Sequence, residues 1–176
     1  EYTEPYYAFA FGKIQLKDTC ILEDFSRNAP IQHGIFIDIF PYDNIPDNSV
    51  KRTFFLLINQ ILKNLLWIKC GYGEETHKKQ FSYKFLSVIA YMFSVEKLKK
   101  IRRNLLNQYN NIRTDKCITS DYPKERLDNR WFANLVKYKF EDAEFLGFKD
   151  CENYLKCLYG DFMKIPSKSE RVTHTN

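Results

Sequence analysis

The sequence lacks the short motifs that identify several large enzyme classes. It contains no G-x-S-x-G nucleophile motif, no phosphate-binding P-loop and no dinucleotide-binding G-x-G-x-x-G segment. No motif pairs a cysteine nucleophile with a histidine base either. Motif evidence for nucleophilic hydrolases, P-loop enzymes and dinucleotide-dependent enzymes is therefore missing.

Cysteine usage gives no sign of a disulfide framework or a zinc knuckle. None of the cysteines form a C-x-x-C pair, and their number is odd and their spacing wide. We expect most of them to be reduced thiols in or near a core, as in a cytoplasmic protein. They are Cys20, Cys70, Cys117, Cys151 and Cys157.

A long hydrophobic run is also missing. Within residues 53–70 the longest uninterrupted apolar run is residues 54–58, and the same stretch contains Lys63 and Lys69. A spanning helix needs about 20 predominantly apolar residues. We therefore predict no transmembrane segment in this portion of the protein.

The composition that remains is that of a globular domain. Hydrophobic residues make up 44% and aromatic residues 16% of the 176 residues, which excludes a disordered chain. The formal net charge of +5 is modest. It suits phosphate-bearing substrates or an anionic membrane surface, and it is too diffuse to indicate a nucleic-acid partner.

The order of the predicted elements indicates an α+β fold. The prediction comprises strands at residues 5–14 and 19–22 paired as a hairpin, a strand at 35–40 and a loop at 41–47; helices at 54–68, 83–93 and 94–107; strands at 117–120 and 133–140; and a helix at 150–159. Asp47 or Asn48 and then Ser94 are expected to cap the first and third helices, and Gly71 and Gly160 to end the first and last ones.

The predicted helix at 94–107 has a basic face. We interpret this face as a solvated helix surface, with a membrane-binding or phosphate-binding patch as the alternative. Its residues are Lys97, Lys99, Lys100, Arg102 and Arg103.

Asp38 is the strongest physical anomaly in the sequence. In an extended strand Phe36, Asp38 and Phe40 share one face, and the isoleucines at 35, 37 and 39 share the other. A carboxylate between two apolar faces is costly unless it is paired, hydrogen-bonded or bound to a cation. Two interpretations stay open: a structural aspartate, or a metal-binding carboxylate that needs further acidic residues nearby.

A second polar cluster lies near the end of the chain. The end of a helix explains Gly160 and Pro166. It does not explain Arg171 and His174, a cation and a titratable imidazole that could contact a phosphate. A polar tail without such a role is the alternative.

Four blocks of the sequence match, in order, the blocks of one protein family. They are YYAFAFGK at residues 6–13, HGIFIDIFPYD at 33–43, YPKER at 122–126 with WF at 131–132, and YGDFMKIP at 159–166, followed by Arg171 and His174. Together they resemble the LicD family of lipopolysaccharide cholinephosphotransferases, to which the fukutin and fukutin-related proteins of animals are more distantly similar. The resemblance covers nearly the whole chain.

The resemblance implies a nucleotidyltransferase-like fold with a mixed sheet and flanking helices. Residues 1–176 would be the C-terminal portion of a LicD-type domain that transfers phosphocholine from CDP-choline to a hydroxyl of a cell-surface glycan, of the lipopolysaccharide or teichoic acid type. The expected location is cytoplasmic, with peripheral contact to the membrane face. Asp38 matches the third carboxylate of a catalytic Mg²⁺ (or Mn²⁺) site, and Arg171 and His174 are the candidate substrate contacts.

One departure from the family pattern limits what these residues could do alone. The upstream W-D-D-D-I-D block, which would supply the other two carboxylates, does not occur in the sequence. One aspartate does not hold Mg²⁺, which normally has several oxygen ligands. We therefore expect the chain, which starts at Glu1, to be N-terminally incomplete and inactive alone. The competing hypotheses are a truncated, non-catalytic module that binds a glycan or a protein, and a transferase of another phospho-alcohol.

Overall fold

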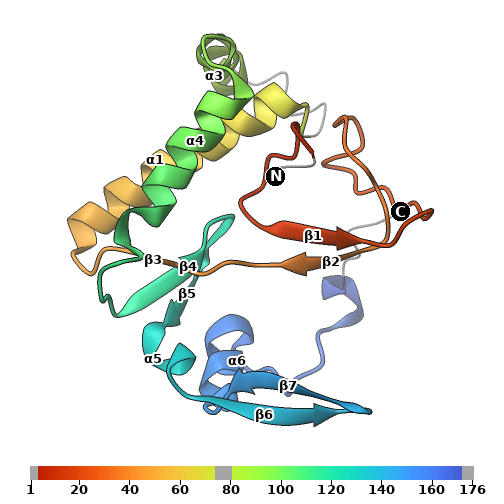
Figure 1. Cartoon of the computed structure of the whole chain (residues 1–176), viewed down its shortest axis with the longest axis vertical. Helices are drawn as coiled ribbons and strands as arrows, with labels where there is room; N and C mark the ends of the chain where they lie inside the picture. Colours follow the sequence, from red (N-terminus) through yellow and green to blue (C-terminus); the bar gives the residue numbers. More distant parts are fainter. Residues whose placement is uncertain (1–3, 74–80, 172–176) are drawn as a thin grey trace.

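The computed structural model describes residues 4–73 and 81–171 of the chain (Figure 1). Its combination of helices with small sheets confirms the predicted α+β class. The described elements are β1 (Gly12–Gln15), β2 (Phe36–Ile39), β3 (Asp43–Asn44), α1 (Ser49–Cys70), α3 (Phe81–Tyr91), α4 (Val95–Leu106), η1 (Asn107–Tyr109), β4 (Lys116–Thr119), β5 (Tyr122–Asp128), α5 (Asn129–Phe132), β6 (Leu135–Phe140), β7 (Ala143–Phe148), α6 (Cys151–Tyr159) and η2 (Lys168–Glu170).

Helices α1, α3 and α4 pack together at one end of the molecule, and the β6–β7 hairpin lies at the other (Figure 1). Asn48 caps α1, because its side chain accepts from the backbone N–H groups of Val50 and Lys51 at 3.1 and 3.0 Å. Gly71 ends α1 in the left-handed conformation, with φ of 82°. Ser94 caps α4 in the predicted way. The predicted helices are thus present, and the predicted caps of α1 and α4 are confirmed.

The strand pairings differ from the expected mixed sheet. The described strands form three small sheets, β1–β2, β3–β4–β5 and β6–β7, and every pairing is antiparallel. Both β4–β5 and β6–β7 are hairpins with short connections, which only antiparallel strands can have. The nucleotidyltransferase-like arrangement stays a prediction.

The predicted hairpin of residues 5–14 with 19–22 is wrong, because β1 pairs with β2 instead. Residues 19–22 form no described strand, although Ile21 N–H donates to His33 O. The chain before β2 runs close to the end of β1, so that a Cβ on Gly34 would meet Leu16 O at 2.8 Å. This close approach explains why glycine occupies position 34.

Three strands were not predicted. The two-residue strand β3 lies inside the predicted loop 41–47, and β5 and β7 are the strands at 122–128 and 143–148. The turn before β7 places Glu141 at a φ of 54°, which is uncommon for a residue other than glycine. Residues 140–143, which form this turn, include no glycine from which the turn could have been predicted.

Aromatic residues of the N-terminal segment form the centre of the main core. Tyr7, Phe9 and Phe11 are buried and pack together, with ring centroids 4.8–6.1 Å apart. Leu66 of α1 and Leu98 of α4 complete this core from the helical side. A smaller cluster of Ile45, Phe55, Leu106 and Ile118 joins the helices to the β3–β4–β5 sheet.

All five cysteines are free, and two of them are buried. Burial raises the pKa of Cys70 to about 11 and that of Cys117 to about 12. The other three are exposed, so the expectation that most cysteines lie in or near a core holds for Cys70 and Cys117 alone.

A buried ion pair between Arg102 and Asp121 connects the helices to the rest of the chain. Arg102 Nη2 donates to Asp121 Oδ1 at 2.8 Å, and the two side chains are 3% and 2% exposed. Asp121 Oδ2 accepts from Ala10 N–H at 2.7 Å, and Arg102 Nε donates to Asn59 Oδ1 at 3.0 Å. The interpretation of α4 as carrying a solvated basic face is therefore wrong for Arg102, which points into the protein.

Within the described residues, no helix combines the length and the hydrophobicity that crossing a membrane requires. The longest described helix is α1, and Lys63 and Lys69 interrupt its apolar sequence.

Arg102→Gln should destabilise the fold by about 3–5 kcal/mol, because it leaves the Asp121 carboxylate buried without its closest cation. Urea unfolding followed by circular dichroism measures the loss. Lys100→Gln is the matched control, since it removes one positive charge from an exposed position of the same helix and should change stability by less than about 0.5 kcal/mol. Equal effects of the two substitutions would contradict a structural role for the ion pair.

Candidate functional site

Asp38 lies on the inward face of the β1–β2 sheet. Phe36 and Asp38 are half-buried, whereas Ile37 and Ile39 of the same strand are 70% and 51% exposed. The predicted alternation along β2 is therefore confirmed. The isoleucine face is uncovered in the described part of the chain, and Asp38 faces the aromatic core.

Lys13 of β1 stands opposite Asp38 and pairs more closely with another carboxylate. Its Nζ lies 2.9 Å from Glu23 Oε2 and 3.5 Å from Asp38 Oδ1. The same ammonium lies 3.0 Å from the centre of the Phe36 ring, and the Lys13 side chain is 6% exposed. Because Lys13 donates a hydrogen bond to Glu23 and lies farther from Asp38, its ion pair with Asp38 is the weaker of the two.

Burial raises the pKa of the Asp38 carboxyl, and Lys13 offsets part of this effect. Oδ1 of Asp38 is buried, and none of the described residues is within hydrogen-bond geometry of it. The Tyr7 hydroxyl is buried in the same way, and burial together with the nearby Asp38 charge raises the pKa of Tyr7. Apart from the 3.5 Å ion pair with Lys13, Asp38 thus presents one carboxylate oxygen that accepts no hydrogen bond from the described residues.

The donor set around Asp38 is incomplete for a magnesium ion. In residues 4–73 and 81–171, no group of three or more histidine, cysteine, aspartate or glutamate side chains is placed to hold a metal. The unused Oδ1 is an oxygen of the kind that Mg²⁺ prefers. Glu23 shares Lys13 with Asp38, and Lys13 Nζ donates a hydrogen bond to it. The described residues therefore fit one ligand of such a site.

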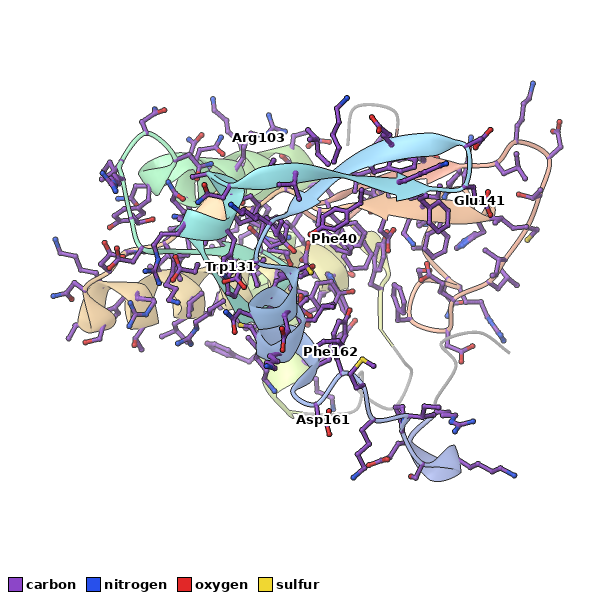
Figure 2. The ribbon with its side chains drawn as sticks, turned by 90° about the horizontal axis from the view of Figure 1, so that it is seen from below. Phe40, Arg103, Trp131, Glu141, Asp161 and Phe162 are labelled. Carbon is purple, nitrogen blue, oxygen red and sulfur yellow. The ribbon has the colours of Figure 1, made fainter. Side chains whose placement is uncertain are left out.

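Of the two C-terminal candidate residues, Arg171 belongs to the described part of the chain. Arg171 is exposed, and its Nε donates to Pro166 O at 3.0 Å, a contact within its own segment. The segment after Phe162 extends away from the rest of the chain (Figure 2). His174 lies outside the described residues. The hydrogen bond of Arg171 is therefore to Pro166 of its own segment and not to Asp38.

The block around residue 160 has mainly a structural explanation. Helix α6 ends at Gly160, as predicted, and the N–H of Gly160 donates to Lys156 O. Its φ of 65° is positive, but its ψ of −120° lies outside the left-handed helical region that is common at the ends of helices. This backbone conformation is one that glycine adopts far more readily than other residues.

Sequence reasoning missed the two residues that bind each other beside Asp38. Lys13 stood only inside a block of family resemblance, and Glu23 was not singled out. One signal was available for Lys13: with period 2, Phe11 and Lys13 fall on the same face, so a lysine follows a buried aromatic residue. The identity of its partner depends on the pairing of β1 with β2.

Comparison with known proteins identifies one informative relative. The chain is 24% identical over 178 aligned residues to the lipopolysaccharide cholinephosphotransferase LicD of Haemophilus influenzae. The alignment covers 96% of this chain and 63% of the relative, so the chain spans less than two thirds of the relative's length. No family model and no solved structure matches the chain. The similarity supports a relation to the LicD family.

At pH 7, the Asp38→Asn variant should be about as stable as the wild type, or more stable. A carboxyl whose pKa is raised by folding stabilises the protein below its unfolded pKa of about 4, and this contribution is lost as pH rises through the folded-state pKa. Asparagine does not ionise, so the variant does not lose stability in this pH range through position 38. Lys13 keeps Glu23 as its partner. The difference in unfolding free energy, variant minus wild type, should therefore increase from pH 4 upward.

Urea unfolding at a series of pH values measures this difference. Glu23→Gln is the comparison, because it removes the 2.9 Å partner of a nearly buried lysine and should destabilise more than Asp38→Asn does. A difference between Asp38→Asn and wild type that falls as pH rises would contradict the predicted direction.

Proposed function

We propose that this chain is part of a transferase that moves phosphocholine from CDP-choline to a hydroxyl of a cell-surface glycan, of the lipopolysaccharide or teichoic acid type. The observation that carries the proposal is the similarity to a lipopolysaccharide cholinephosphotransferase over 96% of the chain. Because the chain spans 63% of that relative, the activity is assigned to the protein as a whole.

Asp38 is the residue to which we assign a direct role. Its buried Oδ1 is left without a hydrogen bond while Lys13 is held by Glu23, so this oxygen can accept a divalent cation. We assign it as one ligand of Mg²⁺ (or Mn²⁺), together with carboxylates from outside the described residues. A cation of this kind, when bound, neutralises negative charge on phosphoryl oxygens during transfer.

Arg171 and His174 are assigned to the phosphate-bearing substrate. Arg171 is exposed and donates its Nε to Pro166 O, and a guanidinium has further N–H donors on its terminal nitrogens with which to contact a phosphate. All five cysteines are free, which is consistent with the cytoplasmic location that the proposal includes, with peripheral contact to the membrane. Another phospho-alcohol from a nucleotide-linked donor would fit the same arrangement.

A second candidate function is that of a non-catalytic module that binds a glycan or a protein. The observation that favours it is the incomplete donor set, since the described residues bring no three metal ligands together. An Asp38 without a cation would then be a structural aspartate paired with Lys13.

Asp38→Asn should lower transfer by at least about a hundredfold, because the cation would lose a carboxylate ligand. The assay uses the product of the whole reading frame that contains these residues, with labelled CDP-choline, Mg²⁺ and a glycan acceptor, and measures the label on the glycan. Asp142→Asn is the control, since this aspartate lies in the exposed turn between β6 and β7 and should keep full activity.

Two outcomes of this assay would contradict the proposal. Near-wild-type transfer by Asp38→Asn would exclude Asp38 as a cation ligand. A wild-type protein that binds the glycan and transfers nothing, with Mg²⁺ or with Mn²⁺, would favour the binding module.

The 176-residue chain by itself should bind Mg²⁺ with a dissociation constant above about 1 mM, because a single carboxylate oxygen replaces too few of the waters of the ion. Isothermal titration calorimetry measures the affinity, and Asp38→Asn should change the weak signal little. Micromolar binding by the chain would mean that the ligands of the cation lie elsewhere in it.

A further inference from the structure

Helix α1 presents a second apolar side, which is turned away from the core. Its inward side carries Phe55, Leu62 and Leu66, which pack into the two core clusters. Five further apolar side chains, spaced three and four residues apart, follow another side of the helix and are 41–62% exposed. This outer stripe consists of Val50, Phe54, Leu57, Ile58 and Ile61.

The outer stripe is continuous along residues 50–61. With 3.6 residues per turn, the polar residues of this stretch, such as Thr53 and Gln60, fall on other sides of the helix. Single exposed apolar side chains are ordinary on a protein surface, whereas a continuous stripe indicates contact with another molecule. A helix that is apolar on two sides is typical of one that is covered on both. The described part of the chain covers only the inward side of α1.

Helix α3, which packs against α1, also exposes apolar side chains (Figure 1). Phe85 and Val88, with Met92 directly after the helix, keep the helical spacing and are 63–75% exposed. The two helices meet where Lys69 Nζ of α1 lies 4.9 Å from the centre of the Tyr91 ring. Exposed apolar side chains are therefore a shared property of this helical pair.

The charges of α1 and α3 all have one sign. Neither helix contains an aspartate or a glutamate, and together they contain Lys51, Arg52, Lys63, Lys69 and Lys84. Two of the five cations are engaged within the fold, because Arg52 donates to backbone carbonyls before α1 and Lys63 pairs with a buried carboxylate. Lys51 and Lys84 are exposed, and helical geometry places Lys51 at the edge of the outer stripe. An apolar stripe beside lysines, without acidic residues, is complementary to a negatively charged apolar surface.

We propose that the outer stripe of α1 lies against a membrane that contains anionic lipids. A helix that binds in the plane of a membrane places its apolar side chains at the level of the headgroups and acyl chains, and its lysines contact the charged headgroups. A second copy of this chain is the less favoured occupant, since a symmetric contact would bring the same lysines together. The inference rests on the proposed function for the role of this contact, while its evidence is the exposure and the charge of α1.

The experiment measures flotation of the 176-residue chain with two kinds of vesicle, phosphatidylcholine alone and phosphatidylcholine mixed with phosphatidylglycerol. The chain should float with the anionic vesicles at low salt and less at high salt. Phe54→Gln combined with Leu57→Gln should weaken this binding by at least about tenfold, because two apolar side chains no longer leave water. Lys51→Gln should weaken it by about fivefold, the loss expected for one lysine near an anionic surface.

Phe140→Gln combined with Leu146→Gln is the matched control. It makes the same two changes on the β6–β7 hairpin, at side chains that are 65% and 68% exposed. Vesicle binding by this control should stay within about twofold of the wild type. Circular dichroism and urea unfolding verify that both double variants are folded.

The outcomes separate lipid from the other occupants of the stripe. Equal losses in the two double variants, flotation that does not depend on the anionic lipid, or no flotation would overturn the proposal. A dimer that the outer-stripe substitutions dissociate, without flotation, would assign the stripe to a second copy. Flotation of the chain but not of the product of the whole reading frame would assign it to the rest of that polypeptide.

This inference and the proposed function can fail separately. Transfer to a soluble glycan acceptor without vesicle binding would contradict the membrane contact alone. Vesicle binding through the outer stripe without transfer would contradict the transferase function alone.

Discussion

The buried pair of Arg102 and Asp121 determines how the N-terminal segment lies against the helices. Asp121 fixes the backbone of Ala10 through Oδ2, two residues before β1 begins at Gly12. From there β1 carries Lys13 to its place opposite Asp38. Hydrophobic contacts of Phe9 and Phe11 would tolerate small shifts of this segment, whereas a buried charge network is satisfied in very few geometries. The geometry around Asp38 therefore depends on an ion pair in another part of the fold.

The N-terminal segment also borders two cavities. Residues 8–10 line the one beside α4, and Phe9 lines a much smaller one with Lys13 and Glu23. Lys13 of the smaller cavity pairs with Asp38, whose Oδ1 has no hydrogen bond from the described residues. A buried carboxylate oxygen of this kind is an acceptor that suits a cation.

The sequence allowed the helices and the anomaly at Asp38 to be predicted, because both depend on local patterns. Asn48, Ser94 and Gly71 act within one turn of the helices that they cap or end. The strand partners could not be predicted in the same way, since β1 joins β2 across the twenty residues between them. The inward position of Arg102 was also beyond the sequence: the basic pattern of α4 does not say which charge faces Asp121, nineteen residues later.

The two buried thiols make the two core clusters separately observable. Cys70 belongs to the main core, and Cys117 lies in β4 beside the smaller cluster around Ile118. Because burial keeps both thiols protonated and out of reach of reagents, each reacts only when its own surroundings open. The exposed Cys20, Cys151 and Cys157 react at once and give the reference rate. The rates of alkylation at the two buried positions would then report whether the helical half and the β4 half of the molecule unfold together or one after the other.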